Sequence, residues 1–323
     1  MQQECVKVAG IGIDVSGAKL DLAIRFTDNR YLDSSHDNNA KGIKSLLSVL
    51  KRQETARTVP LVIESTGNCH LQSALMIKQG NYLVKVINPL LTKKFQKSSV
   101  RNAKTDKIDA RRLADIALIE PNLPDFLGNI DDMANKKLTS YLGHLEKVRQ
   151  RMNSSLKQLE QTAKPLKISI DLKPIKKAIG KIEEQMDAIV ESLKESLPEK
   201  AKEIVRTTKG ISEKQMATLL AAIGNKQFEN RDKLVAYVGL DVALRQSGGW
   251  RGKQKLSKRG EGYVRKVLYQ IAWSLKQNNA EYKIYFNRIK NENKKHYNTA
   301  MVATARKFLR FMYACYFQRT GLV

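Results

Sequence analysis

The sequence predicts three consecutive parts: an α/β N-terminal part, a central antiparallel helical hairpin, and a mostly helical C-terminal part. Three observations lead to this prediction. Short apolar, β-like runs alternate with helical patterns in the first third, two long amphipathic runs follow, and helical periodicity dominates after residue 200. We place the boundaries at 1–125, 126–199 and 200–323, and a chain of 323 residues is long enough for two or more domains.

The N-terminal part opens with two strands joined by a turn at Ser16-Gly17, which favours an antiparallel hairpin. Glu64 ends a short buried strand, Gly80 is suited to end a helix, and Pro89 ends a further strand. The order ββ-α-β-α-β-α predicts a mixed sheet with flanking helices. We expect strands over 7–13, 19–26, 62–64 and 82–88, and helices over 40–52, 70–79 and 104–118.

The central part has apolar residues at three- and four-residue steps on both sides of a connector bounded by Pro165 and Pro174. This pattern predicts two long antiparallel helices, which fit either a coiled-coil arm for spacing and dimerisation or an ordinary bundle core. In the C-terminal part, the turn at Gly210 resembles a helix-hairpin-helix turn, whose backbone N–H groups can face a DNA phosphate. Further helices are expected over 261–277, 281–292 and 298–319.

The charge of the chain predicts a polyanionic partner. Lysine and arginine number 58 against 32 acidic residues, which gives a net charge of +26. Such an excess predicts salt-sensitive binding to nucleic acid. The three cysteines show no metal or disulfide spacing, no secretory signal is visible, and the apolar runs are shorter than the ~18 residues of a membrane span. We therefore expect a reducing cytoplasm and no membrane partner.

Four carboxylates in the first third have the arrangement of a metal site. Asp14 and Glu64 end β-like runs, whereas Asp106 and Asp109 lie three residues apart on one face of a predicted helix. Carboxylate oxygens are the ligands of hard cations, so the set predicts a site for Mg²⁺ or Mn²⁺. Any one of these acids alone would more simply be a solvated group or a helix cap. Inside a cationic chain, the set points to phosphodiester chemistry.

A glycine-rich basic loop at 245–266 predicts a second functional segment. Its glycines let the backbone approach a ligand, Trp250 is available for stacking, and its cations could clamp phosphates. Ser247 could act as a nucleophile on phosphorus beside these cations, although a loop serine more often belongs to a turn. The residues that we expect to contact nucleic acid are Lys104, Arg245, Trp250, Arg251, Lys253, Lys255, Lys258 and Arg259.

Taken in order, the segments IGIDVS, IEST, INP, KTDKIDARRLA and SGGWRG…LSKRG resemble one family over nearly the whole chain. It is the family of DEDD-type insertion-sequence transposases, or bridge RNA-guided recombinases, with pilin-gene DNA invertases among its relatives. The resemblance implies a RuvC-like, RNase H-type N-terminal domain with Asp14, Glu64, Asp106 and Asp109 as metal ligands. It also implies that Ser247 forms a covalent phosphoserine link to DNA.

The same resemblance implies the partners of the enzyme. These are double-stranded target and donor DNA, a structured noncoding guide RNA, and further copies of the chain in a dimer or tetramer in a prokaryotic, nucleoid-associated setting. Three alternatives remain open: an invertase of the same superfamily, a hydrolytic RuvC-like junction nuclease that needs no serine, and an architectural nucleic-acid-binding protein. If the guide RNA pairs with both DNAs, as the resemblance implies, the target and donor sites are set by that RNA.

Overall fold

The structure is a computed structural model that describes residues 6–65, 67–96, 106–126, 128–243, 246–247, 250–251 and 255–318. Within these ranges, only the backbone is described for Lys94, Gln96, Asp106, Ala243, Gln246, Ser247, Trp250, Arg251 and Lys255. The contacts of the chain divide it into two compact units, residues 1–129 and 130–323.

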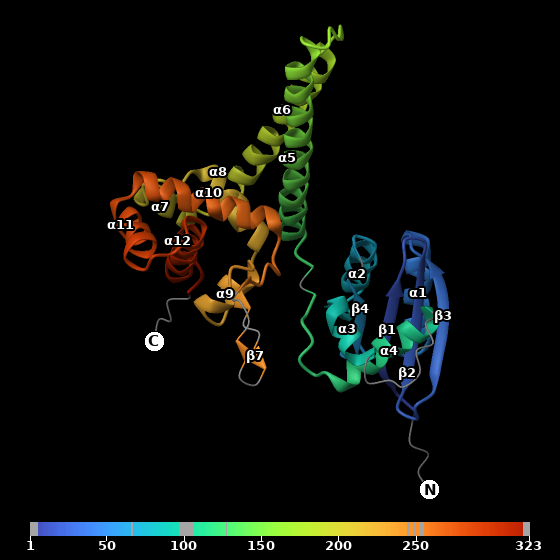
Figure 1. The fold of residues 1–323 in the computed structure, drawn as a ribbon. Coiled ribbons are helices and arrows are strands. Elements are labelled where there is room, and N and C mark those ends of the chain that lie inside the picture. The colour runs from blue at the N-terminus through green and yellow to red at the C-terminus, as the bar shows by residue number, and fades with distance from the viewer. Residues whose placement is uncertain are drawn as a thin grey trace. The chain divides into compact units, whose positions relative to one another are not determined.

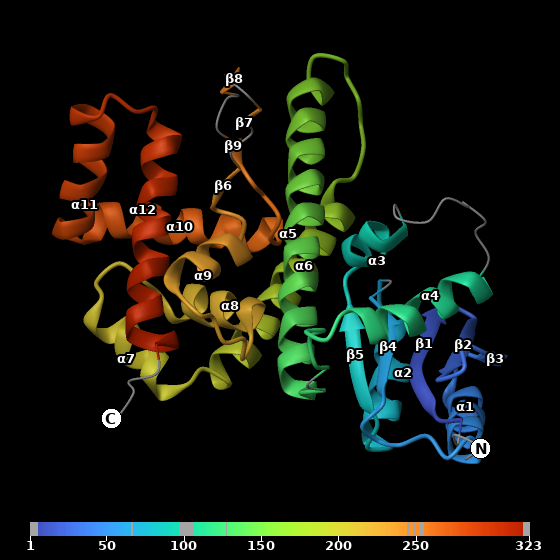
Figure 2. The ribbon, with the colours of Figure 1, turned by 90° about the horizontal axis from the view of Figure 1, so that it is seen from below.

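The first unit is built on a mixed sheet of five strands, which confirms the predicted sheet (Figures 1 and 2). The strand order is β3-β2-β1-β4-β5. Neighbouring strands β1, β2 and β3 are antiparallel, whereas β1, β4 and β5 run parallel. The bounds are β1 Val8–Val15, β2 Lys19–Phe26, β3 Tyr31–Asp37, β4 Pro60–Glu64 and β5 Leu83–Ile87.

Helices cover both faces of this sheet. Alternation along β1 sends Ile11 and Ile13 into a core with α1, while the intervening Gly10 and Gly12 face α4 on the other side. Asn39 caps α1 by accepting a hydrogen bond from the Gly42 N–H. This layered arrangement is consistent with an RNase H-like domain. The helices are α1 Ala40–Arg52, α2 His70–Gln79, α3 Pro89–Gln96 and α4 Asp106–Ile119.

The second unit begins with two long helices, α5 (Ile130–Ala163) and α6 (Lys173–Glu195), which run side by side in Figure 1. Ion pairs join Arg149 to Glu183 at 2.8 Å and Lys176 to Glu160 at 2.8 Å. Because the partner on α6 moves back as the partner on α5 moves forward, the two helices are antiparallel.

The remaining helices of the second unit enclose one core together with the N-terminal half of α5 and the C-terminal half of α6. Gly143 of α5 lets α10 approach closely, since a Cβ there would lie 2.8 Å from the Tyr263 side chain. Next to this crossing, Lys266 of α10 pairs with Glu146 of α5 at 2.7 Å. The elements are α7 Glu199–Thr207, α8 Glu213–Ile223, α9 Arg231–Tyr237, α10 Gly262–Asn278, α11 Ala280–Asn287 and α12 Tyr297–Met312, with π-helical turns η1 Arg288–Glu292 and η2 Tyr313–Phe317.

Several elements differ from the sequence expectations. Neither β3 nor α3 is predicted, and the basic loop contains two short ladders before α10 begins at Gly262. Gly210, expected to offer its N–H to a phosphate, has a positive φ of 104° and lies against the α10 backbone, where a Cβ would be 3.0 Å from the Ser274 carbonyl. A glycine is therefore required at position 210 by the backbone conformation and by the close packing against α10. No helix among the described residues is long and apolar enough to cross a bilayer.

Candidate functional site

The register of two parallel strands brings Asp14 and Glu64 side by side. In the β1–β4 pair Ile13 lies opposite Ile63, so the next residue on each strand is a carboxylate. Both acids alternate with residues of the core under α1 and α2, and therefore leave the sheet on the face that α4 covers. Two predicted ligands from distant parts of the sequence thus share one edge and one face of the sheet.

Helix α4 lies directly on β1 because β1 carries glycines on that face. A Cβ on Gly12 would be 2.0 Å from the Ala110 carbonyl oxygen, and a Cβ on Gly10 would be 2.6 Å from that of Ala114. Real Cβ contacts are never this short, so any side chain would push the helix away. The glycines of the GIGID segment therefore set the distance between strand and helix.

The same contacts give the direction of α4 along β1. Two residues forward on the strand, about 6.6 Å, correspond to four residues back on the helix, about 6 Å. One further step leads from the Gly12–Ala110 contact to Asp14 and Asp106. The first turn of α4 thus begins at the strand position of Asp14, although nothing is described of the Asp106 side chain itself.

Two of the acids are held by neighbours that the sequence analysis did not identify. Thr92 of α3 donates a hydrogen bond from Oγ1 to Glu64 Oε2 at 2.5 Å. Arg112 donates from Nη1 to Asp109 Oδ1 at 2.7 Å. Asp109 and Glu64 are both half-buried. No sequence signal marks Thr92, because the helix that carries it was not predicted, whereas Arg112 lies three residues after Asp109 on the same face and was readable.

A further carboxylate faces the same space. Asp21 of β2 is the cross-strand partner of Asp14, and directly opposed residues of an antiparallel pair project from the same face. Like charges opposed in this way repel each other unless a cation lies between or near them. The alternation of Asp21 with the buried Leu20 and Leu22 is the sequence signal that could have placed it there.

The donor set fits a hard divalent cation, because every candidate ligand is a carboxylate oxygen. Within the side chains that the structure describes, no three acidic, histidine or cysteine groups are close enough together to hold a metal ion. The Asp106 side chain, which the sequence predicts as one of the ligands, lies outside that description. The geometry therefore brings Asp14 and Glu64 together and aims the start of α4 at them.

Polar contacts fix the rotation of α4 about its axis. Asp115 accepts a hydrogen bond from Arg25 at 2.6 Å and another from the Tyr31 hydroxyl, and Arg111 pairs with Asp33. Burial, together with the Asp115 hydrogen bond, raises the pKa of Tyr31 to about 12, so its hydroxyl stays a donor. Since β2 and β3 hold α4 at two successive turns, the face that carries Asp109 cannot rotate freely.

The predicted nucleophile lies on an excursion of the chain between α9 and α10. An outer ladder pairs β6 (Val242–Ala243) with β9 (Lys255–Leu256), and an inner ladder pairs β7 (Gln246–Ser247) with β8 (Trp250–Arg251). At the base, the Ser257 N–H donates to the Asp241 carbonyl at 3.0 Å. The Ser257 hydroxyl also bonds to the Asp241 carboxylate. The backbone of Ser247 is thereby presented on a hairpin, which we call the serine hairpin (residues 241–257).

The structure describes only some of the basic residues of the predicted nucleic-acid interface. Lys258 and Arg259 are exposed at the base of the serine hairpin. Lys266 and Arg265, counted in the basic loop, are engaged inside the unit with Glu146 and the Gly260 carbonyl. Lys104, Arg245 and Lys253 lie outside the described residues, and only the backbone is described for Trp250, Arg251 and Lys255.

Two family models match the chain. Residues 11–165 match a DEDD transposase model of the IS110 type, described as "Transposase". Residues 202–287 match the model described as "Transposase IS116/IS110/IS902 family". The chain is therefore a DEDD-type DNA transposase, an enzyme of DNA recombination. It belongs to the IS110 family of insertion-sequence transposases, as its motifs indicate. No curated protein sequence matches the chain.

Proposed function

We propose that this transposase is an RNA-guided recombinase in which Ser247 cleaves DNA and the DEDD acids hold a divalent cation. The observation that carries the proposal is the convergence of the first two acids, Asp14 and Glu64, with the start of α4, which bears Asp106 and Asp109. The serine hairpin supplies a hydroxyl on a basic, glycine-rich segment. The proposal uses both features, because an acid site alone leaves the serine hairpin without a role and the serine hairpin alone leaves the acids without one.

The acids would hold Mg²⁺ or Mn²⁺ at the α4 face of the sheet. Asp14, Glu64, Asp106 and Asp109 would supply the oxygen ligands, and the bound cation would neutralise charge on a phosphodiester during strand cleavage. Thr92 and Arg112 orient Glu64 and Asp109 through the hydrogen bonds described above. Outer hydrogen bonds of this kind set the direction of a ligand oxygen and so tune metal affinity.

The serine would act on DNA phosphorus. Its Oγ loses a proton and forms a bond to phosphorus, while the bond from phosphorus to the leaving deoxyribose oxygen breaks and that oxygen takes up a proton. Phosphodiester energy is kept in the phosphoserine link, so the reverse attack by a different DNA hydroxyl would rejoin strands without net hydrolysis. The neighbouring cations favour the alkoxide and the charge that develops on the phosphate.

Sequence choice would come from a structured guide RNA that pairs with target and donor DNA. The protein would then contact backbone and shape, and its net charge of +26 suits that task. The antiparallel α5–α6 hairpin would assist assembly of a dimer or tetramer, since its length exceeds what the core of the second unit covers.

The experiment is a denaturing trap for a covalent protein–DNA adduct, made with the full chain expressed with its native flanking DNA. Wild type is expected to give an adduct, and Ser247→Ala and Asp109→Ala are each expected to abolish it while leaving nucleic-acid binding intact. Two exposed positions outside the α5–α6 hairpin give matched controls, Ser48→Ala and Glu292→Gln, and neither should reduce the adduct.

The contrary results are specific. DNA cleavage that persists in Ser247→Ala without any adduct would mean that water is the nucleophile, as in a hydrolytic junction nuclease. An adduct that persists in Asp109→Ala would remove the acids from strand cleavage. Removal of the noncoding flank with no loss of recombination would refute the guide RNA but leave the serine chemistry standing.

A further inference from the structure

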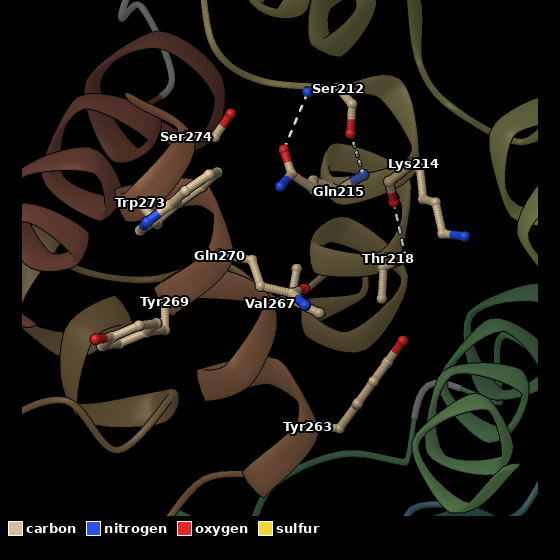
Figure 3. A pocket seen from close by; sticks show the side chains of 10 residues that line it. All are labelled: Ser212, Lys214, Gln215, Thr218, Tyr263, Val267, Tyr269, Gln270, Trp273 and Ser274. Carbon is tan, nitrogen blue, oxygen red and sulfur yellow. Dashed lines mark hydrogen bonds between the residues drawn. The ribbon is translucent and has the colours of Figure 1, made fainter. Parts of the chain in front are cut away.

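A pocket in the second unit lies outside the acids and the serine hairpin. It opens between the N-terminal half of α8 and α10, and its volume is about 490 Å³ (Figure 3). In Figure 3 the Gln215 side chain extends from α8 toward α10, where Trp273 and Tyr269 form the opposite flank. The lining residues are Ser212, Lys214, Gln215, Thr218, Tyr263, Val267, Tyr269, Gln270, Trp273 and Ser274.

Trp273 is placed at this pocket by the helix and not by the core. Its side chain is 50% exposed, whereas Ile271, Ala272 and Leu275 on the same helix are fully buried. The core of the second unit is therefore complete without it. Tyr269 lies one turn earlier, so two aromatic side chains follow one flank of α10 toward solvent. Aromatic faces that border a pocket in this way are surfaces on which a flat ring can stack.

The polar side chains that line the pocket can form hydrogen bonds with the edge of a planar heterocyclic ring. Gln215 accepts a hydrogen bond from the Ser212 N–H at 3.1 Å through its carbonyl oxygen, which leaves its amide N–H groups for a ligand. Within the described part of the chain, the Gln270 amide has no hydrogen-bond partner and is exposed. A carboxamide offers both donors and acceptors, as the edges of nucleobases do. The hydroxyls of Ser212 and Thr218 already bond to the backbone of α8.

The charge of the pocket favours an anionic ligand. The described residues that line it include no acid, and the cation among them is Lys214, whose side chain is 56% exposed. Its ammonium group is 3.4 Å from Asp187, a long contact between exposed groups that contributes little. Lys214 can therefore turn to a phosphate at the mouth of the pocket without a large loss.

We infer that this pocket binds one unpaired nucleotide of a single-stranded nucleic acid, with the base stacked on Trp273, its edge bonded to Gln270 and Gln215, and its phosphate beside Lys214. A duplex cannot supply this ligand, because its bases are stacked on each other and their faces are covered. The inference rests on the chain's being a nucleic-acid enzyme, and it requires neither the serine chemistry nor the metal site.

The first experiment uses fluorescence. The chain has two tryptophans, so Trp250→Phe in the full-length protein leaves Trp273 as the single tryptophan, whose emission is followed with excitation at the red edge where tyrosine does not absorb. Oligothymidylate and oligouridylate of about eight nucleotides, without divalent metal, should each quench it saturably if the pocket takes unpaired bases. A blunt duplex of equal phosphate concentration should quench much less. A response to one oligonucleotide alone would assign the pocket to DNA or to RNA.

The second experiment measures affinity by fluorescence anisotropy of labelled oligonucleotides. Trp273→Ala should weaken single-strand binding about tenfold, leave duplex binding unchanged, and leave the salt dependence unchanged, because a stacked base releases no counterions. Lys214→Gln should reduce the salt slope by about one. Gln270→Leu should alter the ratio of affinities among different homopolymers. The matched control is Ile284→Ala on α11, a side chain that is 70% exposed.

These readouts separate the inference from the proposed chemistry, since Ser247→Ala protein should bind in the same way. Single-strand affinity that stays within about twofold of wild type in Trp273→Ala would overturn the inference, as would an equal loss for the duplex. If Trp273→Ala instead lowers the sedimenting mass and leaves oligonucleotide binding intact, the pocket belongs to an interface between copies of the chain.

Discussion

Replacement of Gly12 by alanine tests whether the close approach of α4 to β1 controls the acid site. The added Cβ would lie 2.0 Å from the Ala110 carbonyl oxygen, 2.4 Å from the Ala114 nitrogen and 2.7 Å from the Leu113 Cβ. Two of these atoms belong to the helix backbone, so no side-chain rotation relieves the contact. The helix as a whole has to move.

The magnitude follows from these distances. A shift of about 1.4 Å is needed to bring the shortest contact to an ordinary distance of about 3.4 Å. Overpacking of this kind costs about 1–3 kcal/mol, which lowers the melting temperature of a domain this size by roughly 4–12 °C. A misplacement of about 1 Å in a catalytic constellation can cost about 100-fold in rate. We therefore expect recombination to fall far more than stability would explain.

The assay pairs a recombination readout with thermal unfolding of the purified full-length protein. The matched control is Gly17→Ala, because a Cβ at Gly17 meets nothing within 4 Å. Gly17→Ala should keep wild-type recombination and melting temperature. If Gly12→Ala behaves like Gly17→Ala in both assays, the glycine does not set the strand-to-helix distance and the register argument for the acids fails.

Two further substitutions address the contacts around the acids and the hairpin. Thr92→Val removes the hydrogen bond to Glu64 and should raise the Mg²⁺ concentration for half-maximal recombination at least about tenfold. Thr92→Ser keeps the hydroxyl and should show the Mg²⁺ dependence of wild type. Equal Mg²⁺ dependence in all three proteins would contradict a role for Thr92. Burial raises the pKa of Glu146, but hydrogen bonds from Lys266 and Arg149 outweigh it and hold this pKa below its ordinary value of 4.5. A lowered pKa means that the ion pairs stabilise the fold above pH 4.5 and lose that effect as the pH falls through the lowered value. Thermal unfolding across pH should therefore show Glu146→Gln less stable than wild type at neutral pH, with the difference closing below pH 4.5, and a gap that is independent of pH would be inconsistent with this linkage.

The sequence was most informative where apolar periodicity and a helix-ending residue indicate the same element. The helix at Ala40–Arg52 is confirmed, because its apolar residues recur at helical steps. The helix at His70–Gln79 is confirmed as well, and Gly80 ends it as predicted. The elements that were missed lack such agreement. Strand β3, Tyr31–Asp37, has only half-buried or exposed residues and therefore shows no apolar alternation in the sequence. It is held in the sheet by its antiparallel pairing with β2.

The candidate site was readable in its residue types but not in its packing. Asp14 and Glu64 could be placed at strand ends, and their meeting follows only from the parallel pairing of β1 with β4. Thr92 could not be found, because α3 begins at a proline that the pattern reads as a stop. The metal roles of the acids and the role of Ser247 remain predictions, as do the three domain boundaries. The pocket at Trp273 was invisible to periodicity, which cannot distinguish a face that meets water from one that meets a ligand.

The match between β1 and α4 has a consequence for how this enzyme can change over evolution. Two strand residues and four helix residues advance by nearly the same length, so each second residue of β1 meets each fourth residue of α4. Replacing a solvent-facing side chain of α4 leaves this match unchanged, whereas inserting one residue in α4 after Asp109 would turn the start of the helix by about 100° and shift it by about 1.5 Å relative to Gly12. Related chains should therefore vary in residue identity at the solvent-facing positions of this helix, and hardly at all in the number of residues between Asp106 and Ala114.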